Sequence, residues 1–250
     1  MLNLLVDIGN TRVKWTRHDP GRPGSALRAV EACPYPDFRK DPGRVVAGLE
    51  PGDRVWFCAT AEGGPALLER ALGGRGVELI RGAAHCPLRV DYGPGLGDDR
   101  LLAADEAVDR LGNPCVVIGC GSAVTVDLVG GGEEPLLLGG AILAGERLIL
   151  RTLGGLGTLP RVEATEAPRP PGTTTEDCLR LGAHRQCTAA VADLIAEYAA
   201  LLGRGLSGLP LLLHGGDAER YRGYFPEAVF EEFAILFSLA RRAAGGPKPL

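Results

Sequence analysis

The chain has 250 residues, enough for one large domain or for two smaller ones. Hydrophobic residues make up 45% of it and charged residues 23%, a balance that permits a sizeable core and excludes wholesale disorder. The formal net charge is −4 and the arginines are scattered among acidic residues, which argues against a general nucleic-acid or membrane-surface binder, because both functions need clustered positive charge.

The cysteine pattern and the N-terminal sequence indicate where the protein works. None of the seven cysteines belongs to a C-x-x-C pair, so we expect free thiols in a reducing cytoplasm and neither a zinc site nor a redox site. Asp7 interrupts the first apolar run before the core of a signal peptide could form, and no apolar run approaches the roughly 20 residues of a membrane span. The sequence therefore predicts a soluble, cytoplasmic protein with no membrane partner and no nucleic-acid partner.

The first half of the chain alternates short apolar runs with segments of helical spacing. The elements predicted there are, in chain order, strands at 2–7 and 13–15, a proline- and glycine-rich connection over 20–24, a strand at 54–60, and helices at 65–72 and 98–111.

After residue 113 the pattern restarts. The elements predicted there are strands at 115–118, 124–129, 136–143 and 209–213, helices at 148–153, 175–198 and 231–244, and a tail that frays. The strand at 136–143 is apolar and is expected to be buried. The opening V-D-I-G-N-T-R-V-K is matched by I-G-C-G-S-A-V-T-V from Ile118, since both read as strand, glycine turn, strand. The sequence therefore predicts an α/β protein with a duplication, whose halves cover 1–113 and 114–250.

Three glycine-containing turns follow three of the predicted strands, at 7–11, 119–122 and 214–217. Such a turn can aim several backbone N–H groups at one point, where phosphate oxygens satisfy them, and glycine permits the close approach. Each turn could instead be an ordinary β-turn. Neither a Walker A sequence nor a G-x-G-x-x-G helix opener is present, which disfavours a P-loop fold or a dinucleotide-binding fold.

Two acidic positions have the right residue types for phosphoryl transfer. Asp7 stands before the first turn, where a carboxylate would meet the magnesium ion that accompanies ATP phosphates, although it could simply close its own turn. Asp99 and Arg100 follow a glycine-rich loop and could act as a proton acceptor and as a positive charge for the transferred group. The alternative for this second position is capping of the following helix by Asp98 or Asp99.

Taken together, these segments resemble the type III pantothenate kinases, members of the actin-like and sugar-kinase ATPase superfamily. Seven motifs lie in the family's order through nearly the whole chain: D-I-G-N-T-R-V-K from Asp7, Y-G-P-G-L-G-D-D-R from Tyr92, G-S-A-V-T-V-D from Gly121, G-G-A-I-L-A-G from Gly139, L-P from Leu159, G-T-T-T-E-D-C-L-R-L-G from Gly172, and H-G-G-D from His214. Each motif is weak alone, but seven in register are specific. The resemblance implies two duplicated actin/ribonuclease H-like halves, each a mixed sheet flanked by helices, with a nucleotide cleft between them.

The resemblance also implies roles for individual residues. ATP phosphates would be held by the first turn with magnesium on Asp7, and ATP would also contact Ser122, which stands where the family usually has Thr. The residues of the first turn are Asp7, Ile8, Gly9, Asn10, Thr11, Arg12, Val13 and Lys14. The implied pantothenate site comprises Tyr92, Gly97, Asp98, Asp99, Arg100 and Thr175. Asp99 would accept the proton of the primary hydroxyl, the product would be 4′-phosphopantothenate, the first committed intermediate toward coenzyme A, and the protein would be a homodimer.

Several positions depart from the family pattern. The second turn normally opens with an Asp that binds a monovalent cation such as potassium or ammonium, and here that residue is Gly119. Without the carboxylate, we expect cation activation to be weak or absent. Ala144 stands where Pro is usual, His214 replaces the Thr of a T-G-G turn, and 230–237 differs from the usual ending. The departures spare four implied site residues, namely Asp7, Asp99, Arg100 and Thr175.

The sequence leaves two other functions open. One is a non-catalytic, nucleotide-dependent regulatory protein on the same fold, which the loss of an acidic residue at Gly119 motivates. The other keeps phosphoryl transfer but uses a different small alcohol as the acceptor, since a fold alone does not fix the chemistry. ATP binding without acceptor-dependent hydrolysis would favour the first, and a comparison of pantothenate with sugars and polyols as acceptors separates the second.

Overall fold

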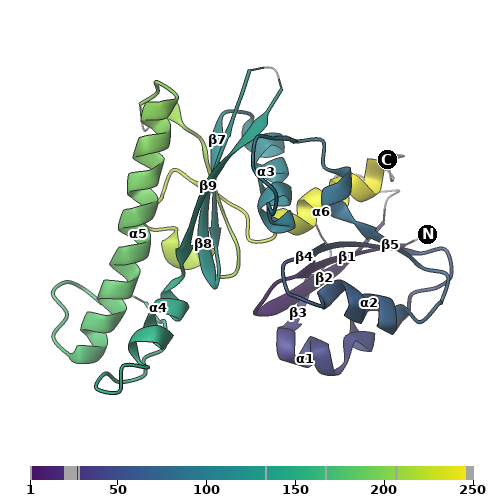
Figure 1. The fold of residues 1–250 in the computed structure, drawn as a ribbon, viewed down its shortest axis with the longest axis horizontal. Helices are drawn as coiled ribbons and strands as arrows, with labels where there is room; N and C mark the ends of the chain where they lie inside the picture. The colour runs from purple at the N-terminus through teal and green to yellow at the C-terminus, as the bar shows by residue number, and fades with distance from the viewer. Residues whose placement is uncertain are drawn as a thin grey trace. The chain divides into compact units, whose positions relative to one another are not determined.

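The chain forms two compact units in a computed structural model, which describes residues 2–19, 27, 29–132, 134–166, 168–205 and 208–245 (Figure 1). Unit 1 comprises Met1–Leu88, Gly93–Glu106 and Phe233–Leu250, and unit 2 comprises Arg89–Tyr92 and Ala107–Glu232. The C-terminal segment thus belongs to the same unit as the N-terminus, whereas the sequence placed all of 114–250 in the second half. The connection expected over 20–24 and the tail at 246–250 lie outside the described residues.

Unit 1 is built on a five-stranded mixed sheet with the strand order β3-β2-β1-β4-β5. Its strands are β1 (Asn3–Ile8), β2 (Arg12–His18), β3 (Glu31–Pro34), β4 (Arg54–Ala59) and β5 (Glu78–Arg81). The central strand β1 pairs antiparallel with β2 and parallel with β4. Its nearly unbroken apolar sequence follows from this position, because a strand that is buried on both faces does not alternate polar and apolar residues.

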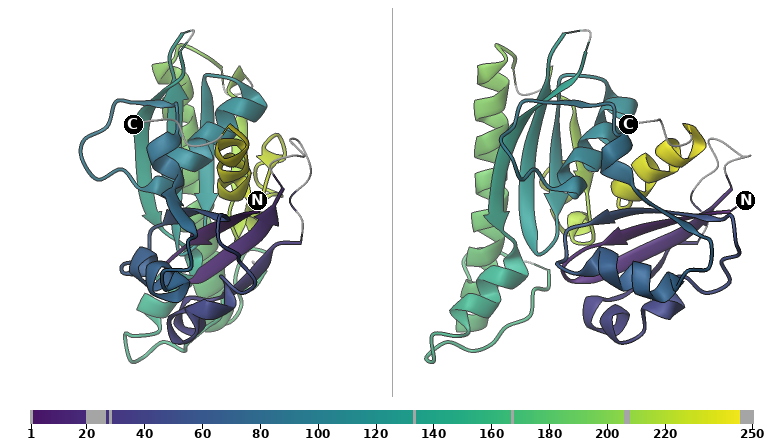
Figure 2. Two further views of the ribbon diagram at one scale, coloured as in Figure 1. Left: turned by 90° about the vertical axis from the view of Figure 1, so that its right-hand side faces the viewer. Right: turned by 45° about the vertical axis from the view of Figure 1, so that its right-hand side comes forward.

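Helices cover both faces of the sheet in unit 1 (Figure 2). α1 (Tyr35–Lys40) and α2 (Gly64–Leu72) share one apolar cluster with β1 and β2, and α6 (Ala234–Gly245) packs against β1 and β4 on the other face. α2 ends at Gly73, whose φ of 52° is the left-handed conformation typical of a helix stop. The first part of α3 (Asp98–Leu111) also belongs to unit 1, where Ser238 of α6 donates a 2.6 Å hydrogen bond to Asp105.

Unit 2 is built on a six-stranded mixed sheet with the strand order β11-β10-β7-β8-β9-β6. Its strands are β6 (Arg89–Val90), β7 (Cys115–Cys120), β8 (Ala123–Gly130), β9 (Leu136–Ala144), β10 (Leu211–His214) and β11 (Val229–Phe230). The long helix α5 (Thr175–Leu201) packs against β8 and against α4 (Glu146–Leu153). Apolar side chains of α5, β7, β8 and β10 form the core of this unit.

The two sheets repeat one topology, which confirms the predicted duplication and the predicted α/β class. In unit 1 the antiparallel hairpin β1–β2 is followed by β4, which runs parallel to β1. In unit 2 the hairpin β7–β8 is followed by β10, which runs parallel to β7. The order β3-β2-β1-β4-β5 therefore corresponds to β9-β8-β7-β10-β11. All of the predicted strands and helices are present; α3 has the predicted bounds and the others have shifted ends. β7 continues to Cys120, so that the second turn is shorter than expected.

The prediction that the strand at 136–143 is buried was wrong. Within β9, Leu137 is buried, but the later part is largely exposed, and 63% of Ile142 is accessible to solvent. β6 pairs only with Leu136 and Leu137, so the rest of that edge of β9 has no neighbouring strand among the described residues. An apolar run does not tell whether both faces of a strand are covered. The sequence also missed α1, β3, β5, β6 and β11, because such short segments show no clear period.

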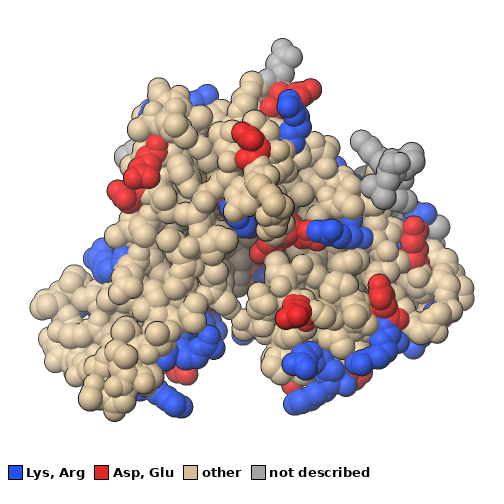
Figure 3. Space-filling view, in the orientation of Figure 1, with Lys and Arg blue, Asp and Glu red and all other residues tan. Residues whose placement is uncertain are grey.

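The surface carries charges of both signs. On the face drawn in Figure 3, Lys and Arg side chains lie beside Asp and Glu side chains. All seven cysteines are free thiols, and of these only Cys178 is exposed. Among the helices that the structure describes, none combines the length and the apolar character that crossing a bilayer requires.

Candidate active site

Asp7 is the penultimate residue of β1, at the carboxyl end of the strand in unit 1. Its direct cross-strand partners are Lys14 on β2 and Cys58 on β4. Side chains of directly paired residues lie on the same face of a sheet. Strand pairing therefore places a carboxylate and an ammonium group side by side where the first glycine turn begins, and Lys14 Nζ lies 5.1 Å from the centre of the Phe233 ring.

The turn after β1 is tight and faces solvent. The backbone N–H of Gly9 donates a 3.0 Å hydrogen bond to the carbonyl oxygen of Arg12, which closes the turn. A Cβ atom at position 9 would lie 3.1 Å from that same oxygen, so a larger residue would require the turn to shift. Asn10, Thr11 and Arg12 are exposed. This turn has the tight, glycine-dependent and accessible backbone that phosphate binding requires.

The first residues of α3 differ in their surroundings. Asp98 is buried and receives two hydrogen bonds, of 2.6 and 2.7 Å, from the guanidinium group of Arg81 on β5. Arg100 is also buried, whereas Asp99 is only partly buried. The carboxylate of Asp99 folds back over Gly97, where a Cβ atom would lie 2.5 Å from Asp99 Oδ1. Asp98 is therefore committed to an ion pair inside unit 1, and Asp99 presents the more accessible carboxylate.

The pKa of Asp7 depends on burial and on the charges of Lys14 and Asp99. Burial raises the pKa of Asp7 to about 6, the ammonium group of Lys14 acts to lower it, and the charge of Asp99 raises it further. Burial also raises the pKa of Asp99, against the backbone N–H and the charge of Arg100. The pKa of Cys58 is raised well above its ordinary value by burial and by the charges of both carboxylates. The charge of Asp99 therefore acts on the carboxyl of Asp7, and that the two residues serve one site stays a prediction.

Asp7 fits a magnesium ion that is carried by a nucleotide. Within the described ranges, no group of three or more His, Cys, Asp or Glu side chains is arranged to hold a metal ion by itself. A magnesium ion that binds with ATP needs only one or two carboxylates, together with phosphate oxygens and water. A pKa of about 6 leaves the Asp7 carboxylate ionised at neutral pH, at the start of the proposed phosphate turn.

In unit 2, the second and third glycine turns lie against each other. The backbone N–H of Asp217 donates a 3.1 Å hydrogen bond to the carbonyl oxygen of Cys120, and a Cβ atom on Gly215, which has a φ of 100°, would collide with the Cys120 backbone. Gly145 packs closely against the backbone of Gly121 and Ser122, and its N–H donates a 3.1 Å hydrogen bond to the carbonyl oxygen of Ser122. The sequence missed Gly145, although a glycine between a predicted strand and a predicted helix was a usable signal.

Gly119 does not fit the monovalent cation that the family resemblance implies. It is the penultimate residue of β7 and lies directly opposite Thr125 on β8 and His214 on β10. A Cβ atom on Gly119 would lie 2.6 Å from Thr125 Oγ1 and 3.0 Å from His214 Nε2. Gly119 therefore contributes no side-chain oxygen, and Thr125 and His214 already fill the space where its side chain would stand.

The other predicted site residues of unit 2 lie at its surface. Tyr92 is 41% exposed, and its ring lies on Gly139, where a Cβ atom would be 3.4 Å from Tyr92 Cδ2. Thr175 is the first residue of α5 and is exposed. The preceding residue, Thr174, is the N-cap, and its Oγ1 accepts a 3.1 Å hydrogen bond from a backbone N–H in the first turn of the helix.

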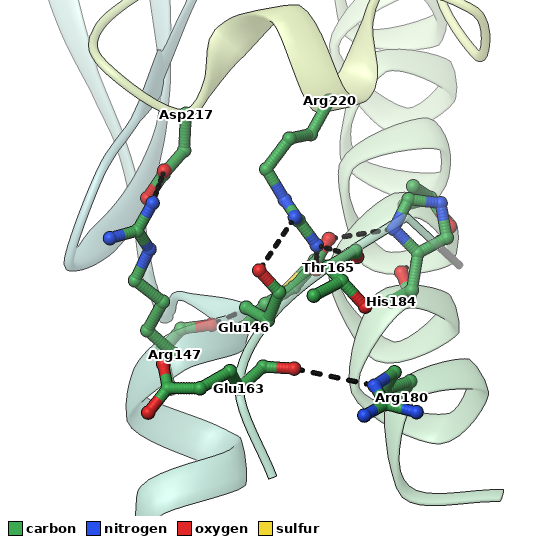
Figure 4. A network of polar contacts seen from close by, with 12 residues as sticks. Glu146, Arg147, Glu163, Thr165, Arg180, His184, Asp217 and Arg220 are labelled. Carbon is green, nitrogen blue, oxygen red and sulfur yellow. Dashed lines mark hydrogen bonds and ion pairs between the residues drawn. The ribbon is translucent and has the colours of Figure 1, made fainter. Parts of the chain in front are cut away.

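A buried polar network in unit 2 was not predicted (Figure 4). A hydrogen bond of 2.6 Å joins His184 Nδ1 to Glu146 Oε1, and Arg220 forms an ion pair with the same carboxylate. Arg220 also donates to the carbonyl oxygens of Ala164 and Thr165, at 3.0 and 2.6 Å. Burial acts to raise the pKa of Glu146, but the hydrogen bonds from His184 and Arg220 lower it below its ordinary value. The network fixes the segment that leads to the N-terminus of α5, and no local pattern reveals it, since His184 and Arg220 are 38 and 74 residues from Glu146.

Three comparisons with known proteins identify the family and the fold. Residues 46–197 match the model of a family described as type III pantothenate kinase. A type III pantothenate kinase from Synechococcus sp. (strain JA-3-3Ab) is 34% identical over 220 residues, which are 86% of this chain and 80% of that protein.

Two solved structures resemble the fold. One is a Campylobacter jejuni protein described as a conserved Baf family transcriptional activator, with a TM-score of 0.60 at 20% identity, covering 95% of this chain and 96% of that one. The other is a Sinorhizobium meliloti protein described as a 2-dehydro-3-deoxygalactonokinase, with a TM-score of 0.57 at 12% identity, covering 97% of this chain and 95% of that one. At these identities the likeness concerns the fold alone.

Proposed function

Because the chain belongs to the type III pantothenate kinase family, it is a pantothenate kinase, and we propose that the residues around Asp7 and Asp99 in unit 1 carry its phosphoryl transfer. The reaction moves the γ-phosphoryl group of ATP to the primary hydroxyl of pantothenate and gives 4′-phosphopantothenate and ADP. The observation that carries the proposal is the electrostatic proximity of the carboxylate at the end of β1 and the carboxylate at the start of α3.

Asp99 is the proposed proton acceptor. Burial raises its pKa, which brings a carboxylate base closer to the operating pH. Asp99 takes the proton of the pantothenate hydroxyl while the hydroxyl oxygen forms a bond to the γ-phosphorus. The bond from that phosphorus to the bridging oxygen breaks, and ADP leaves. Arg100, the next residue of α3, supplies positive charge for the negative charge that spreads over the transferred group.

The first turn is the proposed binding site for the phosphates. Asp7 holds magnesium, which offsets part of the phosphate charge when it is bound with ATP. Lys14 lies beside Asp7 on the neighbouring strand and adds a positive charge at the same face. Asn10, Thr11 and Arg12 are exposed residues of this turn, and in the proposal the turn meets the phosphate oxygens there.

The family resemblance assigns the further substrate contacts to three residues that belong to unit 2. Ser122 contacts ATP from the turn between β7 and β8, where Gly145 and Gly215 keep the surrounding backbone close. Tyr92 and Thr175, both exposed, contact pantothenate. The network of Glu146 includes His184 on α5, the helix that begins with Thr175, and so helps to hold that helix in unit 2.

A cytoplasmic homodimer is the proposed form of the protein. Unit 2 exposes large apolar side chains, with Ile142 at 63%, Leu156 at 62% and Leu201 at 72% accessibility, and a second copy of the chain would remove such surface from water. The seven free thiols suit a reducing compartment.

The test is a coupled assay of ADP formation with ATP, magnesium and pantothenate. The wild-type protein should turn over, and Asp99→Asn should lower kcat by about 10²–10⁴-fold, because a positioned general base is lost, while the melting temperature changes little. Asp109→Asn is the matched control, since Asp109 is exposed on the same helix. Equal turnover of Asp99→Asn and wild type would show that the assigned base is wrong. Sugars and polyols as acceptors test the alternative of another small alcohol, and ATP binding without acceptor-dependent ADP release would indicate a regulatory protein.

A further inference from the structure

At the end of β7, the position equivalent to Asp7 is Gly119, and the imidazole of His214 on the neighbouring strand β10 lies beside it. We propose that His214, together with Thr125, has filled the place above Gly119 that a carboxylate and its monovalent cation would occupy, so that phosphoryl transfer by this chain proceeds without potassium or ammonium. The inference rests on the proposed function for its kinetic test, but the geometry behind it stands within unit 2 alone.

Three neighbouring strands meet at Gly119. In the register of the sheet, Thr125 on β8 and His214 on β10 are its direct partners on either side. Because direct partners point to the same face, both side chains flank the position that a side chain at 119 would take. Thr125 Oγ1 and His214 Nε2 lie 2.6 and 3.0 Å from the place of a Cβ atom there, and His214 is only 8% exposed. The imidazole is therefore a packed part of the sheet face.

The duplication shows what the equivalent position looks like when it carries an acid. Asp7 is the penultimate residue of β1, as Gly119 is of β7, and each is flanked by one antiparallel and one parallel strand. The partners of Asp7 are Lys14 and Cys58, so a small thiol stands on the parallel strand where unit 2 has the imidazole of His214. In unit 1 the carboxylate of Asp7 thus has a small neighbour, Cys58. In unit 2 the carboxylate is absent and the neighbour, His214, is large.

Gly119 and His214 do not provide the ligands that a cation site needs. Monovalent and divalent hard cations bind through several oxygen atoms that take over from their hydration shell. Gly119 offers no side-chain oxygen, and an imidazole nitrogen is a poor ligand for such ions. His214 therefore excludes the cation both because it fills the space and because its nitrogen is a poor ligand. Gly119 and His214 depend on each other: an Asp at position 119 does not fit beside His214, and His214 fits only beside a residue without a side chain.

The coupling predicts the behaviour of three variants. Gly119→Asp alone should lower the melting temperature, because the new Cβ atom meets Thr125 and His214 at less than van der Waals distance. His214→Thr alone should fold and should not respond to cations, since it makes room but adds no carboxylate. The double variant Gly119→Asp/His214→Thr should recover the melting temperature that Gly119→Asp loses and should gain a response to potassium.

The experiment compares turnover with pantothenate in choline chloride, sodium chloride, potassium chloride and ammonium chloride at one ionic strength. We expect kcat/KM of the wild type to vary by less than about twofold, and that of the double variant to rise by about tenfold or more in potassium over choline. A saturable potassium activation of the wild type by about tenfold would overturn the inference. A double variant that folds normally but stays indifferent to potassium would also overturn it, because space and ligand would then not be the reason.

A readout without substrate separates this inference from the proposed function. If the wild type shows no turnover with pantothenate in any salt, the proposed function fails, and the melting temperatures in potassium and choline decide the inference. An ion that binds only the folded state raises the melting temperature. Potassium should therefore raise that of the double variant and leave the wild type unchanged, and equal shifts in both proteins would contradict the occupied position at Gly119.

Discussion

Replacing Asp7 by asparagine should stabilise the free protein while it removes the proposed magnesium ligand. Burial is the main cause that raises the pKa of this carboxyl from 3.8 to about 6 in the folded protein, so the folded chain binds the proton more tightly than the unfolded chain. Stability therefore falls as the pH rises from about 4 to about 6 and levels off above that range. A difference of about two pKa units corresponds to about 3 kcal/mol at neutral pH.

The assay is urea unfolding of the nucleotide-free protein in EDTA, followed by tryptophan fluorescence. The chain has two tryptophans, Trp15 and Trp56, and both are buried in unit 1, so the signal reports the unit that holds Asp7. At about pH 7.5, Asp7→Asn should unfold with a free energy about 3 kcal/mol above that of the wild type, and the gain should vanish near pH 4. The same variant should lose turnover, because it lacks the carboxylate for magnesium.

Asp53→Asn is the matched control with the opposite sign. The Asp53 carboxylate accepts backbone hydrogen bonds of 2.7 Å from Leu2 and 3.0 Å from Glu50. Burial acts to raise its pKa, but these hydrogen bonds lower it below the ordinary value. The stabilisation that Asp53 gives to the folded protein is present above pH 3.8, the ordinary pKa of Asp, and is lost as the pH falls through the lower pKa of the folded state. Asp53→Asn should therefore lower the free energy of unfolding by about 1 kcal/mol at neutral pH and by less in acid. If Asp7→Asn proves less stable than wild type at about pH 7.5, the attraction between the charges of Asp7 and Lys14 outweighs the cost of burial, and the reasoning is refuted.

Two further predictions concern the support of α5. Arg220→Ala should destabilise unit 2 by about 3 kcal/mol, because it leaves the Glu146 carboxylate buried with one partner fewer. Arg222→Ala, which removes an exposed ion pair, should cost only about 0–1 kcal/mol. Thermal unfolding of the two variants checks this, and equal losses of stability would contradict a larger contribution from the buried pair. Thr174→Ala should cost about 1 kcal/mol through the lost N-cap and raise KM for pantothenate more than it lowers kcat, while Thr173→Ala should leave both unchanged; identical behaviour of the two variants would exclude Thr174 as the cap that matters.

The sequence alone determined the local elements and supplied the residues of the candidate site as predictions. Apolar runs and helical spacing placed the strands and helices, since these patterns depend only on neighbours along the chain. The duplicated strand–turn–strand text predicted two sheets of one topology, which the structure confirms. Asp7 and Asp99 were named as site residues from their residue types and from the family resemblance, and in the structure the charge of Asp99 contributes to the raised pKa of Asp7.

Only the tertiary structure decided which side chain meets which over long separations. In the structure, Asp98 pairs with Arg81, and α6 belongs to the first unit. The later part of β9 is exposed, although its apolar sequence predicted a buried strand. The tertiary structure also filled the space above Gly119 with His214, 95 positions away by the numbering of the chain. Such contacts are fixed by strand register and by packing volume, and both arise only when distant segments are brought together, so no local period or spacing encodes them.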